Sequence, residues 1–266
     1  MQPITGKTRI LFILGDPVAH IIGSSLLNEH FAGCGIDAAV SPLHVAPQDL
    51  PALIRTLRTL RNVAGFGVTI PHKGTMMGIV DDLTPMAKLC GATNVIRRDP
   101  DGRLVGGQFD GLGLTQSIID AGHELSGRAA LLAGAGGTAR PVAFALAESG
   151  ITRLEIANRT IGKAEALAAE VRAAYPECDA RLHDGGTEFD VVVNTTSLGM
   201  QADDALPVAP DAIRPGVVVA DAVMAPPETA LLKLARERGA TAHPGIRMLR
   251  AQFERTVEFL GLKAER

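Results

Sequence analysis

The sequence predicts an α/β protein of two domains, each built around a largely parallel sheet. Short apolar runs alternate with amphipathic helical stretches along the whole chain, which is the pattern of strands joined by crossover helices. The length of 266 residues fits two smaller domains more comfortably than one. Glycines near residues 111–113 and 239–245 mark the places where we expect the chain to cross between the domains, with a cleft between them.

The composition excludes several classes of protein. Apolar residues make up 46%, charged residues 21%, and the net charge is −3, which is ordinary for a globular protein and offers no attraction to nucleic acid or anionic membrane. No apolar run has the length of a membrane span, and the first residues lack a signal-peptide layout. Cys34, Cys90 and Cys178 are too widely spaced for a disulfide frame or a metal pair, so we expect a cytoplasmic protein.

The first half of the chain predicts five strands and two main helices. The strands are expected at residues 9–15, 38–45, 65–70, 94–98 and 103–106. Ser24 or Ser25 is expected to cap the first helix by accepting from its free amides. A second helix is expected over residues 47–61, because apolar residues recur there at helical spacing. Asp-Pro-Asp-Gly at residues 99–102 is a turn sequence that predicts a hairpin between the last two strands.

The second half repeats the alternation with longer helices. We expect strands at residues 129–133, 153–157, 190–195 and 217–220. We expect helices at residues 138–149, 163–174, 228–238 and 247–260. Such alternation predicts a doubly wound parallel sheet.

A glycine-rich turn joins the first strand of this half to its helix. It reads Gly134-Ala135-Gly136-Gly137-Thr138-Ala139 and matches Gly-x-Gly-x-x-(Gly/Ala) in the required strand–turn–helix setting. Small residues permit a tight turn and let the backbone approach a pyrophosphate, and the helix start favours negative charge. The turn therefore predicts a Rossmann-type domain that binds NAD or NADP, although such turns also occur as plain connections.

The next strand ends at Asn158-Arg159-Thr160, followed by Lys163. Many NAD sites carry an acid here for the ribose hydroxyls, and this loop has none. Its cations suit the 2′-phosphate of NADP, while the alternative is a solvated loop at a helix start.

Three polar residues follow strands or strand-like segments in the first half. Lys73 comes after residues 65–70, and Asn94 and Asp110 follow the next segments. The carboxyl edge of an open α/β sheet is where ligands bind. Taken singly, however, Lys73 is typical of a solvated charge and Asp110, which precedes a glycine, of a turn residue.

Together these motifs resemble the shikimate/quinate dehydrogenase family, in the same order over nearly the whole chain. The matching segments include residues 15–20, 68–73, 110–111, 134–140, 158–160, 194–197, 221–229 and 245–252. The resemblance implies a shikimate 3-dehydrogenase-like enzyme that transfers hydride reversibly between NAD(P) and the hydroxyl of a cyclic carboxylic acid. It implies a substrate-binding and catalytic domain at residues 1–111, completed by 245–266, and an NAD(P)-binding domain at residues 112–244.

The resemblance also assigns roles. Lys73 and Asp110 would be the catalytic pair, and Thr69, Asn94 and Gln252 would bind the substrate. The implied cofactor contacts are Gly134, Ala135, Gly136, Gly137, Thr138, Ala139, Asn158, Arg159, Thr160, Lys163, Thr195, Thr196, Met224 and Gly245. No metal is implied. The binding partner would be a small hydroxy-acid substrate, and the protein itself would be a monomer or a homodimer.

The sequence departs from the family at several substrate positions. Ile21 and Gly23 stand where two serines usually hold the substrate carboxylate, Gly67 replaces an asparagine, and Met224 replaces a tyrosine. An unpaired buried polar group of a ligand costs roughly 1–3 kcal/mol, so these changes weaken the case for ordinary shikimate binding. The changed substrate positions resemble those of a less common subgroup of the family that tends to use NAD. For this reason we slightly favour NAD over NADP as the expected cofactor.

Two other functions stay open. Loss of the serines is also compatible with a catalytically weak or inactive NAD(P)-binding sensor or pathway partner. A lysine-using folate dehydrogenase has a similar layout, although Asn94 and Gln252 argue against it. Arg55, Arg58 and Arg61 recur at three-residue spacing, which predicts one solvated helix face rather than a site for an anionic partner.

Overall fold

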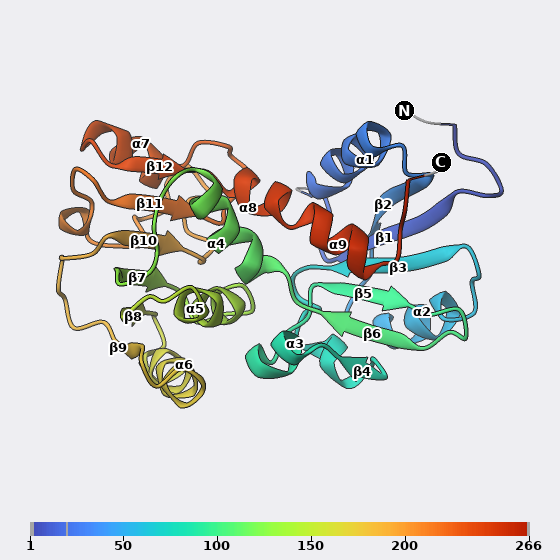
Figure 1. The fold of residues 1–266 in the computed structure, drawn as a ribbon, viewed down its shortest axis with the longest axis horizontal. Helices are drawn as coiled ribbons and strands as arrows, with labels where there is room; N and C mark the ends of the chain where they lie inside the picture. The colour runs from blue at the N-terminus through green and yellow to red at the C-terminus, as the bar shows by residue number, and fades with distance from the viewer. Residues whose placement is uncertain (1–2, 20, 265–266) are drawn as a thin grey trace. The chain divides into compact units, whose positions relative to one another are not determined.

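The computed structural model describes residues 3–19 and 21–264, so His20 of the family motif lies outside the described residues. The chain divides into a first unit, Met1–Phe109 with Gln252–Arg266, and a second unit, Asp110–Ala251 (Figure 1). The predicted α/β class is confirmed, because each unit contains a six-stranded sheet. Among the described residues no helix has the length and apolar character needed to cross a membrane.

The sheet of the first unit is parallel on one side and mixed on the other. Its strands are β1 (Arg9–Gly15), β2 (Ala38–His44), β3 (Val63–Val68), β4 (Asp82–Leu83), β5 (Val95–Arg98) and β6 (Leu104–Gly107). Their order is β2-β1-β3-β5-β6-β4. β1 pairs in parallel with both β2 and β3, whereas β5 is antiparallel to β3 and β6. The predicted hairpin is confirmed, and Gly102 closes its turn at φ +89°, a conformation that glycine adopts without strain.

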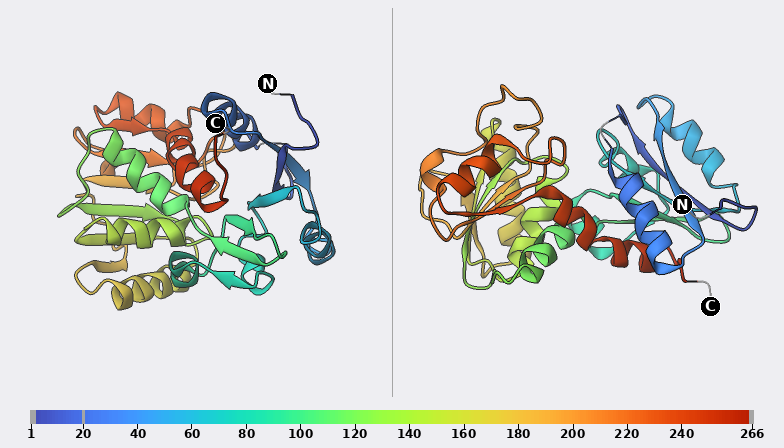
Figure 2. Two further views of the ribbon diagram at one scale, coloured as in Figure 1. Left: turned by 45° about the vertical axis from the view of Figure 1, so that its right-hand side comes forward. Right: turned by 90° about the horizontal axis from the view of Figure 1, so that it is seen from above.

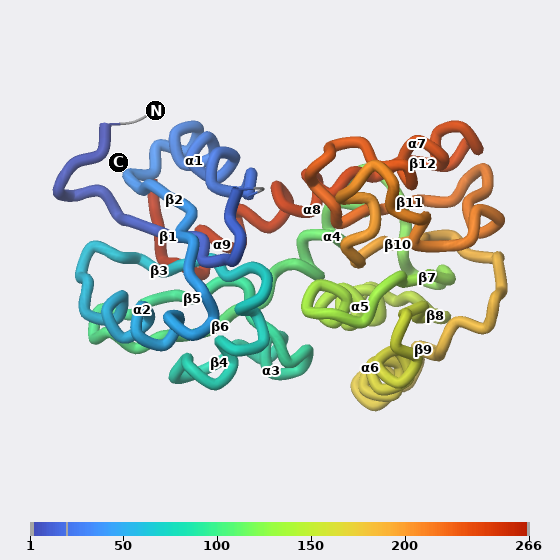
Figure 3. The backbone as a smooth tube through the Cα atoms, turned by 180° about the vertical axis from the view of Figure 1, so that it is seen from behind, coloured from blue at the N-terminus to red at the C-terminus, as the bar shows by residue number. Residues whose placement is uncertain are grey.

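Helices α1 (Gly23–Cys34), α2 (Leu50–Leu57), α3 (Pro85–Cys90) and α9 (Phe253–Phe259) complete the first unit. The apolar stripe of α2 packs on the sheet, since Leu50, Ile54 and Leu57 share a buried cluster with Phe66 and Ile96. Accordingly, α2 lies behind the strands in Figure 1 and in front of them in Figure 3, which shows the opposite side. The helix is shorter than the predicted residues 47–61.

The predicted serine cap of the first helix is wrong. Helix α1 begins at Gly23, and its N-cap residue Ile22 makes no side-chain cap hydrogen bond. The backbone at Ile22 is already near the helical region, at φ −91° and ψ −14°, so Ser24 and Ser25 lie inside the first turn. A capping side chain must belong to the residue just before the helix, whose backbone is usually extended.

The second unit has the strand order of a Rossmann fold. Its strands are β7 (Ala129–Ala133), β8 (Arg153–Ala157), β9 (Asp179–Leu182), β10 (Val191–Asn194), β11 (Val218–Asp221) and β12 (Thr241–His243). They are ordered β12-β11-β10-β7-β8-β9, and every pair is parallel. The chain order reverses between β7 and β10, which is the switch point where dinucleotides bind in such sheets. The sequence prediction missed strands β9 and β12, because Asp-Ala-Arg-Leu and Thr-Ala-His lack the run of valines found in β10 and β11.

The helices of this unit are α4 (Asp110–Asp120), α5 (Ala139–Glu148), α6 (Ile161–Ala174), α7 (Ala230–Glu237) and α8 (Gly245–Ala251). Leu231 and Ala235 of α7 share a buried cluster with Leu131 and Val192 of the sheet. The single helix predicted over residues 247–260 is wrong, because the structure has α8 and α9 instead, drawn in red in Figure 2. Gln252 stands between them as the N-cap residue of α9.

Candidate active site

The turn after β3 holds Lys73 at the carboxyl end of that strand. Thr69 donates its backbone N–H to the Leu14 carbonyl (3.0 Å). His72 is buried, and its Nε2 lies 2.9 Å from the Val45 carbonyl, to which it donates. Lys73 is half-buried, and its carbonyl accepts from the Thr93 amide at 3.4 Å. The lysine is therefore held beside the segment that carries Asn94.

Asn94 and Gln252 form a buried amide pair across 158 positions of sequence. Asn94 Nδ2 donates to Gln252 Oε1 at 3.0 Å, and Asn94 Oδ1 accepts from the Phe109 amide at 2.9 Å. The two side chains are 7% and 5% exposed. The Gln252 Nε2 group has no acceptor among the described residues, yet it keeps some accessible surface. The pair can therefore present an amide donor to a bound hydroxyl.

Ile21 places an apolar group beside Thr69. A Cβ added at Gly15 would lie 2.8 Å from Thr69 Cγ2 and 3.5 Å from Ile21 Cδ1, so both side chains approach the same point. At Gly67 an added Cβ would meet Ile13 at 3.4 Å, an ordinary contact. The backbone therefore leaves room for a side chain at position 67, and neither Ile21 nor Gly67 offers a hydrogen-bond donor from its side chain.

Asp110 begins helix α4 and is the first residue of the second unit. Its side chain is buried, and a carboxylate in the first turn of a helix is stabilised by the helix dipole. It follows directly after Phe109, whose amide is bound to Asn94.

The glycine-rich turn of the second unit lies at the switch point between β7 and β10. Thr195 Oγ1 donates to the Ala133 carbonyl at 2.7 Å, and a Cβ at Gly134 would lie 2.7 Å from that hydroxyl oxygen. Gly134 also adopts φ +113°, so only glycine fits there. The amides of Ala135, Gly136 and Gly137 have no acceptor among the described residues, and the space beside Gly136 is open. Such donors before a helix suit a pyrophosphate.

The loop after β8 carries two exposed cations. Arg159 and Lys163 are exposed and have no ion pair or hydrogen bond from their side chains in the described part of the chain. Asn158 Nδ2 donates to the Thr160 carbonyl at 2.9 Å and holds the loop in a turn. The loop therefore keeps both charges available for an anionic group.

A buried polar network supports these loops, and the sequence alone did not reveal it. Asp221 accepts from Asn194 Nδ2 (2.9 Å), Thr229 Oγ1 (2.6 Å) and the Val223 amide (3.0 Å). Burial raises the pKa of the Asp221 carboxyl, and these hydrogen bonds oppose that change. Asn194 Oδ1 in turn accepts from Thr196 Oγ1 at 2.7 Å. The only sequence signal was that both polar residues end apolar strands.

Gly245 and Met224 lie next to this network. A Cβ at Gly245 would lie 2.7 Å from the Asp221 carbonyl oxygen and 2.8 Å from that of Val223, so Gly245 is required for close packing of the start of α8. Met224 is half-buried in the same loop.

Glu155, His183 and Asp184 are the described residues whose spacing resembles a metal site, with candidate atoms within 4.8 Å of one another. The buried Glu155 carboxylate already accepts from Arg181 Nη2 at 2.9 Å and contacts His183 Nδ1 at 2.8 Å. Its charge is therefore balanced by protein groups.

Comparison with known proteins gives one consistent family. Residues 13–96 match the shikimate dehydrogenase substrate binding domain, and residues 114–201 match the shikimate / quinate 5-dehydrogenase family. A shikimate dehydrogenase (NADP(+)) of Rubrobacter xylanophilus is 42% identical over 92% of this chain and 88% of its own length.

Solved structures agree with this result. The structure of a shikimate dehydrogenase in complex with NADP+ superposes with a TM-score of 0.90 at 31% identity, covering 99% of this chain and 93% of the other. The shikimate 5-dehydrogenase of Listeria monocytogenes in complex with shikimate and NAD gives a TM-score of 0.87 at 29% identity, covering 98% and 94%. The strand order, the glycine-rich turn and this similarity along the chain show that the protein belongs to the shikimate dehydrogenase family of oxidoreductases.

Proposed function

We propose that this protein catalyses reversible hydride transfer between NADP(H) and a ring hydroxyl of a shikimate-like cyclic carboxylic acid. In this proposal residues 1–111 with 245–266 bind the substrate, and residues 112–244 bind the cofactor. The observation that carries it is the buried Asn94–Gln252 amide pair beside the Lys73 turn. Amides that both donate and accept suit a polyhydroxylated ring.

The residues of the second unit fit a dinucleotide. The amides of Ala135, Gly136 and Gly137 have no acceptor among residues 3–19 and 21–264, and they would hold the pyrophosphate. When bound, the nicotinamide supplies the chemistry of hydride transfer. The remaining cofactor contacts would be made by Thr195, Thr196, Met224 and Gly245.

Lys73 and Asp110 would handle the proton. Loss of hydride from a secondary alcohol leaves a carbonyl only if the hydroxyl proton also departs, and the neutral amine of Lys73 would accept it. In the reverse direction the Lys73 ammonium would return the proton to the developing alkoxide. The Asp110 carboxylate would orient the lysine, while Thr69, Asn94 and Gln252 would orient the ring hydroxyls.

The cofactor in this proposal is NADP. The slight lean to NAD that the divergent substrate positions suggested is not confirmed. Arg159 and Lys163 have no ion pair within the described chain, and residues 158–160 contain no acid; both features favour a 2′-phosphate. The relative from Rubrobacter xylanophilus is also named as an NADP(+) enzyme.

The hydroxyl proposed to react is the one at carbon 3, next to the ring double bond, because its oxidation gives a conjugated enone. Relatives carry the name 5-dehydrogenase, so the position of the oxidised carbon in this protein is part of the proposal. Carbon-13 NMR of the product formed from shikimate would identify the oxidised carbon directly.

Lys73→Met tests the proposal. We expect kcat with NADP+ and shikimate or quinate to fall about 10²- to 10⁴-fold, because a positioned acid–base group contributes that much. The Kd for NADP+, measured by calorimetry, should change less than about twofold, because the proposal assigns Lys73 to proton transfer and not to cofactor binding. Lys7→Met, which removes an exposed lysine from the same unit, is the matched control and should leave both quantities unchanged.

The same measurements separate the alternatives. Family membership does not favour a catalytically inactive NAD(P)-binding sensor. Cofactor binding without turnover of shikimate, quinate or amino analogues would support that alternative and contradict the proposal. Full activity of Lys73→Met would remove Lys73 from the mechanism.

A further inference from the structure

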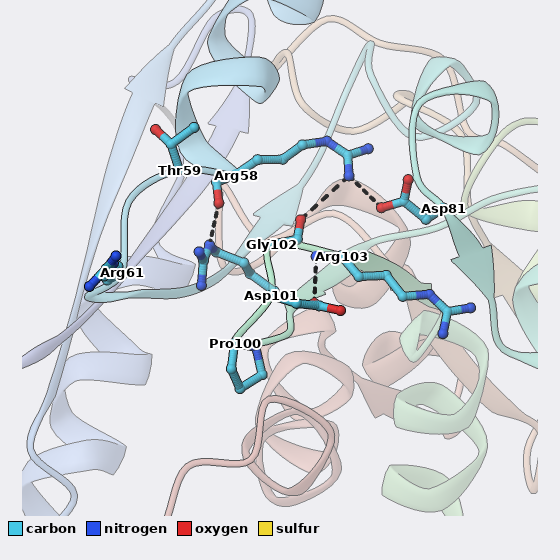
Figure 4. Close-up of a pocket in the computed structure, with 9 residues that line it drawn as sticks. Arg58, Thr59, Arg61, Asp81, Pro100, Asp101, Gly102 and Arg103 are labelled. Carbon is cyan, nitrogen blue, oxygen red and sulfur yellow. Dashed lines mark hydrogen bonds and ion pairs between the residues drawn. The ribbon is translucent and has the colours of Figure 1, made fainter.

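A polar cavity lies in the first unit, and its lining residues have no part in the proposed reaction. Its volume is about 710 Å³, and its lining includes Arg58, Arg61, Arg98 and Arg103 together with Asp81 and Asp101 (Figure 4). Four guanidinium groups against two carboxylates give this lining an excess of positive charge. The protein as a whole has a net charge of −3, so the excess is local.

This cavity lies at the opposite end of the sheet from Lys73. Arg61 precedes β3, whereas Lys73 follows it. Strand β5 is antiparallel to β3, with Arg97 opposite Gly65 and Val95 opposite Gly67, so Arg98 lies near the start of β3 and Asn94 near its end. A strand of this length spans roughly 20 Å, and a ligand in the cavity would not touch the proposed substrate residues.

Two of the four arginines are already neutralised by carboxylates. Arg58 Nη1 is ion-paired with Asp81 and also donates to the Gly102 carbonyl at 3.4 Å, as the dashed lines of Figure 4 show. Arg103 Nη2 lies 3.0 Å from Asp82. Hydrogen bonding and charge from Arg58 lower the pKa of Asp81, so this carboxylate is ionised at neutral pH. These pairs shape the wall of the cavity.

Arg98 is different, because it is only 8% exposed and no described carboxylate lies within ion-pair distance of it. Its Nε donates to the Arg58 carbonyl at 2.8 Å and its Nη1 to the Asp99 carbonyl at 3.1 Å. Nη2 has no acceptor among the described residues and remains accessible from the cavity. Burying a charge without a counter-ion is costly, so an anion bound in this cavity would be stabilised by Arg98.

Gly102 and Arg61 complete the arrangement. Gly102 lies beside the Arg98 guanidinium, because a Cβ added at Gly102 would lie 3.9 Å from Arg98 Nη2. Since glycine has no side chain, it leaves this space open. Arg61 is exposed at the rim and has no ion pair in the described part of the chain. The expectation of a solvated helix face is wrong for Arg58 and Arg61: α2 ends at Leu57, so both lie beyond its last turn.

We propose that this cavity binds a small oxyanion, with Arg98 as the deep contact and Arg61 as the rim contact. Guanidinium groups bind phosphate and carboxylate oxygens through parallel charge-assisted hydrogen bonds. The cavity volume is that of an ordinary small-molecule site, which favours a ligand carrying more than one phosphate or carboxylate group. Ligands of both kinds share this chemistry, and the test distinguishes them.

Calorimetric titration of the full chain with pyrophosphate, and separately with citrate, tests the proposal. We expect at least one of them to bind with a Kd that rises with salt, because screening weakens contacts between charges. Arg61→Ala should weaken that binding about tenfold, the effect of losing one charge-assisted hydrogen bond. Thr59→Glu, which adds a carboxylate to the lining, should weaken it at least as much. Pyrophosphate binding alone would indicate a phosphate ligand, and citrate binding alone a carboxylate ligand.

Arg55→Ala is the matched control. Arg55 is an exposed arginine of α2 that does not line the cavity, so its loss changes the net charge equally and should alter the Kd less than twofold. Equal effects of Arg61→Ala and Arg55→Ala would overturn the proposal, because they would place the anion elsewhere, for example at the Gly134 turn. Absence of binding by both probes at millimolar concentration would also overturn it. Neither result bears on the dehydrogenase assignment.

Discussion

Asn94 shows how one side chain connects distant parts of the first unit. Its amide donates to Gln252 and accepts from Phe109, and its backbone carbonyl accepts from Val68 at 2.7 Å. A residue with both donors and an acceptor can do this while almost fully buried, whereas an aspartate could not donate to Gln252. The residue thereby links the end of β3, the start of β5 and the N-terminus of α9.

Arg159 offers a residue-scale prediction about the cofactor. Arg159→Ala should raise KM for NADP+ about tenfold and leave KM for NAD+ within about twofold, because only NADP carries the 2′-phosphate that the guanidinium would bind. Initial rates with both cofactors check this. Arg172→Ala removes an arginine from the C-terminal part of α6 and serves as a charge control. Equal changes in KM for NAD+ and NADP+ in Arg159→Ala would contradict the prediction.

At the scale of elements, helices α4 and α5 approach one another through Gly111. A Cβ at this position would lie 2.1 Å from the Pro141 carbonyl oxygen and 2.6 Å from its carbon. Contacts this short cannot be relieved by a side-chain rotation, because the obstacle is backbone. Asp110 thus places a carboxylate at the start of α4, and the following position must be glycine because the Pro141 backbone leaves no room for a Cβ.

Gly111→Ala should therefore lower the free energy of unfolding by about 1–3 kcal/mol, the usual cost of forcing extra atoms into a packed interface. Urea denaturation followed by circular dichroism measures it. Gly33→Ala is the matched control, since Gly33 lies in helix α1 with nothing within 4 Å of an added Cβ. That substitution should leave stability unchanged or raise it by up to about 1 kcal/mol through helix propensity. Equal effects of the two substitutions would refute the packing argument.

His243 couples helix α4 to strand β12. Its Nε2 lies 2.8 Å from Ser117 Oγ, and Ser117 donates to the Leu114 carbonyl at 2.8 Å, so the neutral imidazole must donate to the serine. Burial, followed by the positive charge of Arg247, lowers the pKa of His243 to about 4. Its Nδ1 is buried without a described partner, so protonation would place an uncompensated charge in the interior.

The pH dependence follows from this shift. Between about pH 6.5 and pH 4 the unfolded chain binds a proton at residue 243 that the folded chain does not, so stability is lost as the pH falls through this window. The contribution is up to about 3 kcal/mol. His243→Asn should show a smaller decrease in unfolding free energy between pH 7.5 and pH 5 than the wild type. The difference in unfolding free energy between the two proteins at pH 7.5 measures the effect of the substitution on packing. If the unfolding free energies of both proteins fell equally between pH 7.5 and pH 5, His243 would be excluded as the cause of the pH dependence.

Across the whole molecule, the three cysteines differ in their exposure to solvent. Cys34 is exposed, whereas Cys90 and Cys178 are fully buried. Burial also raises the pKa of the Cys178 thiol to about 11, which keeps it in the unreactive thiol form.

The native protein should therefore react rapidly with a thiol reagent such as DTNB at one of its three cysteines, and at all three in urea. The absorbance of the released chromophore counts the reactive thiols. Cys34→Ser should abolish the rapid reaction in the native protein. A rapid reaction that survives this substitution would show that a buried thiol becomes accessible.

The sequence by itself determined the local framework of the protein. Strand β1 and the strands beside the glycine-rich turn lie where they were expected, because apolar alternation, glycine conformation and turn chemistry depend on near neighbours. The Rossmann-type turn between β7 and α5 follows from the glycines between positions 134 and 137 for the same reason. Helix boundaries were less secure: α2 ends early, and Ser24 does not cap α1, because contacts with the rest of the chain decide where a helix stops.

Only the tertiary structure decided which distant side chains meet. The pairing of Asn94 with Gln252 depends on strand order and on the break between α8 and α9, and neither is written in local spacing. The arginines at positions 58, 61, 98 and 103 come together because β5 runs antiparallel to β3 and its hairpin returns beside the end of α2. Hydrogen bonds and charges act over a few ångströms of space. Their partners are therefore fixed by the folded path of the chain and not by distance along it.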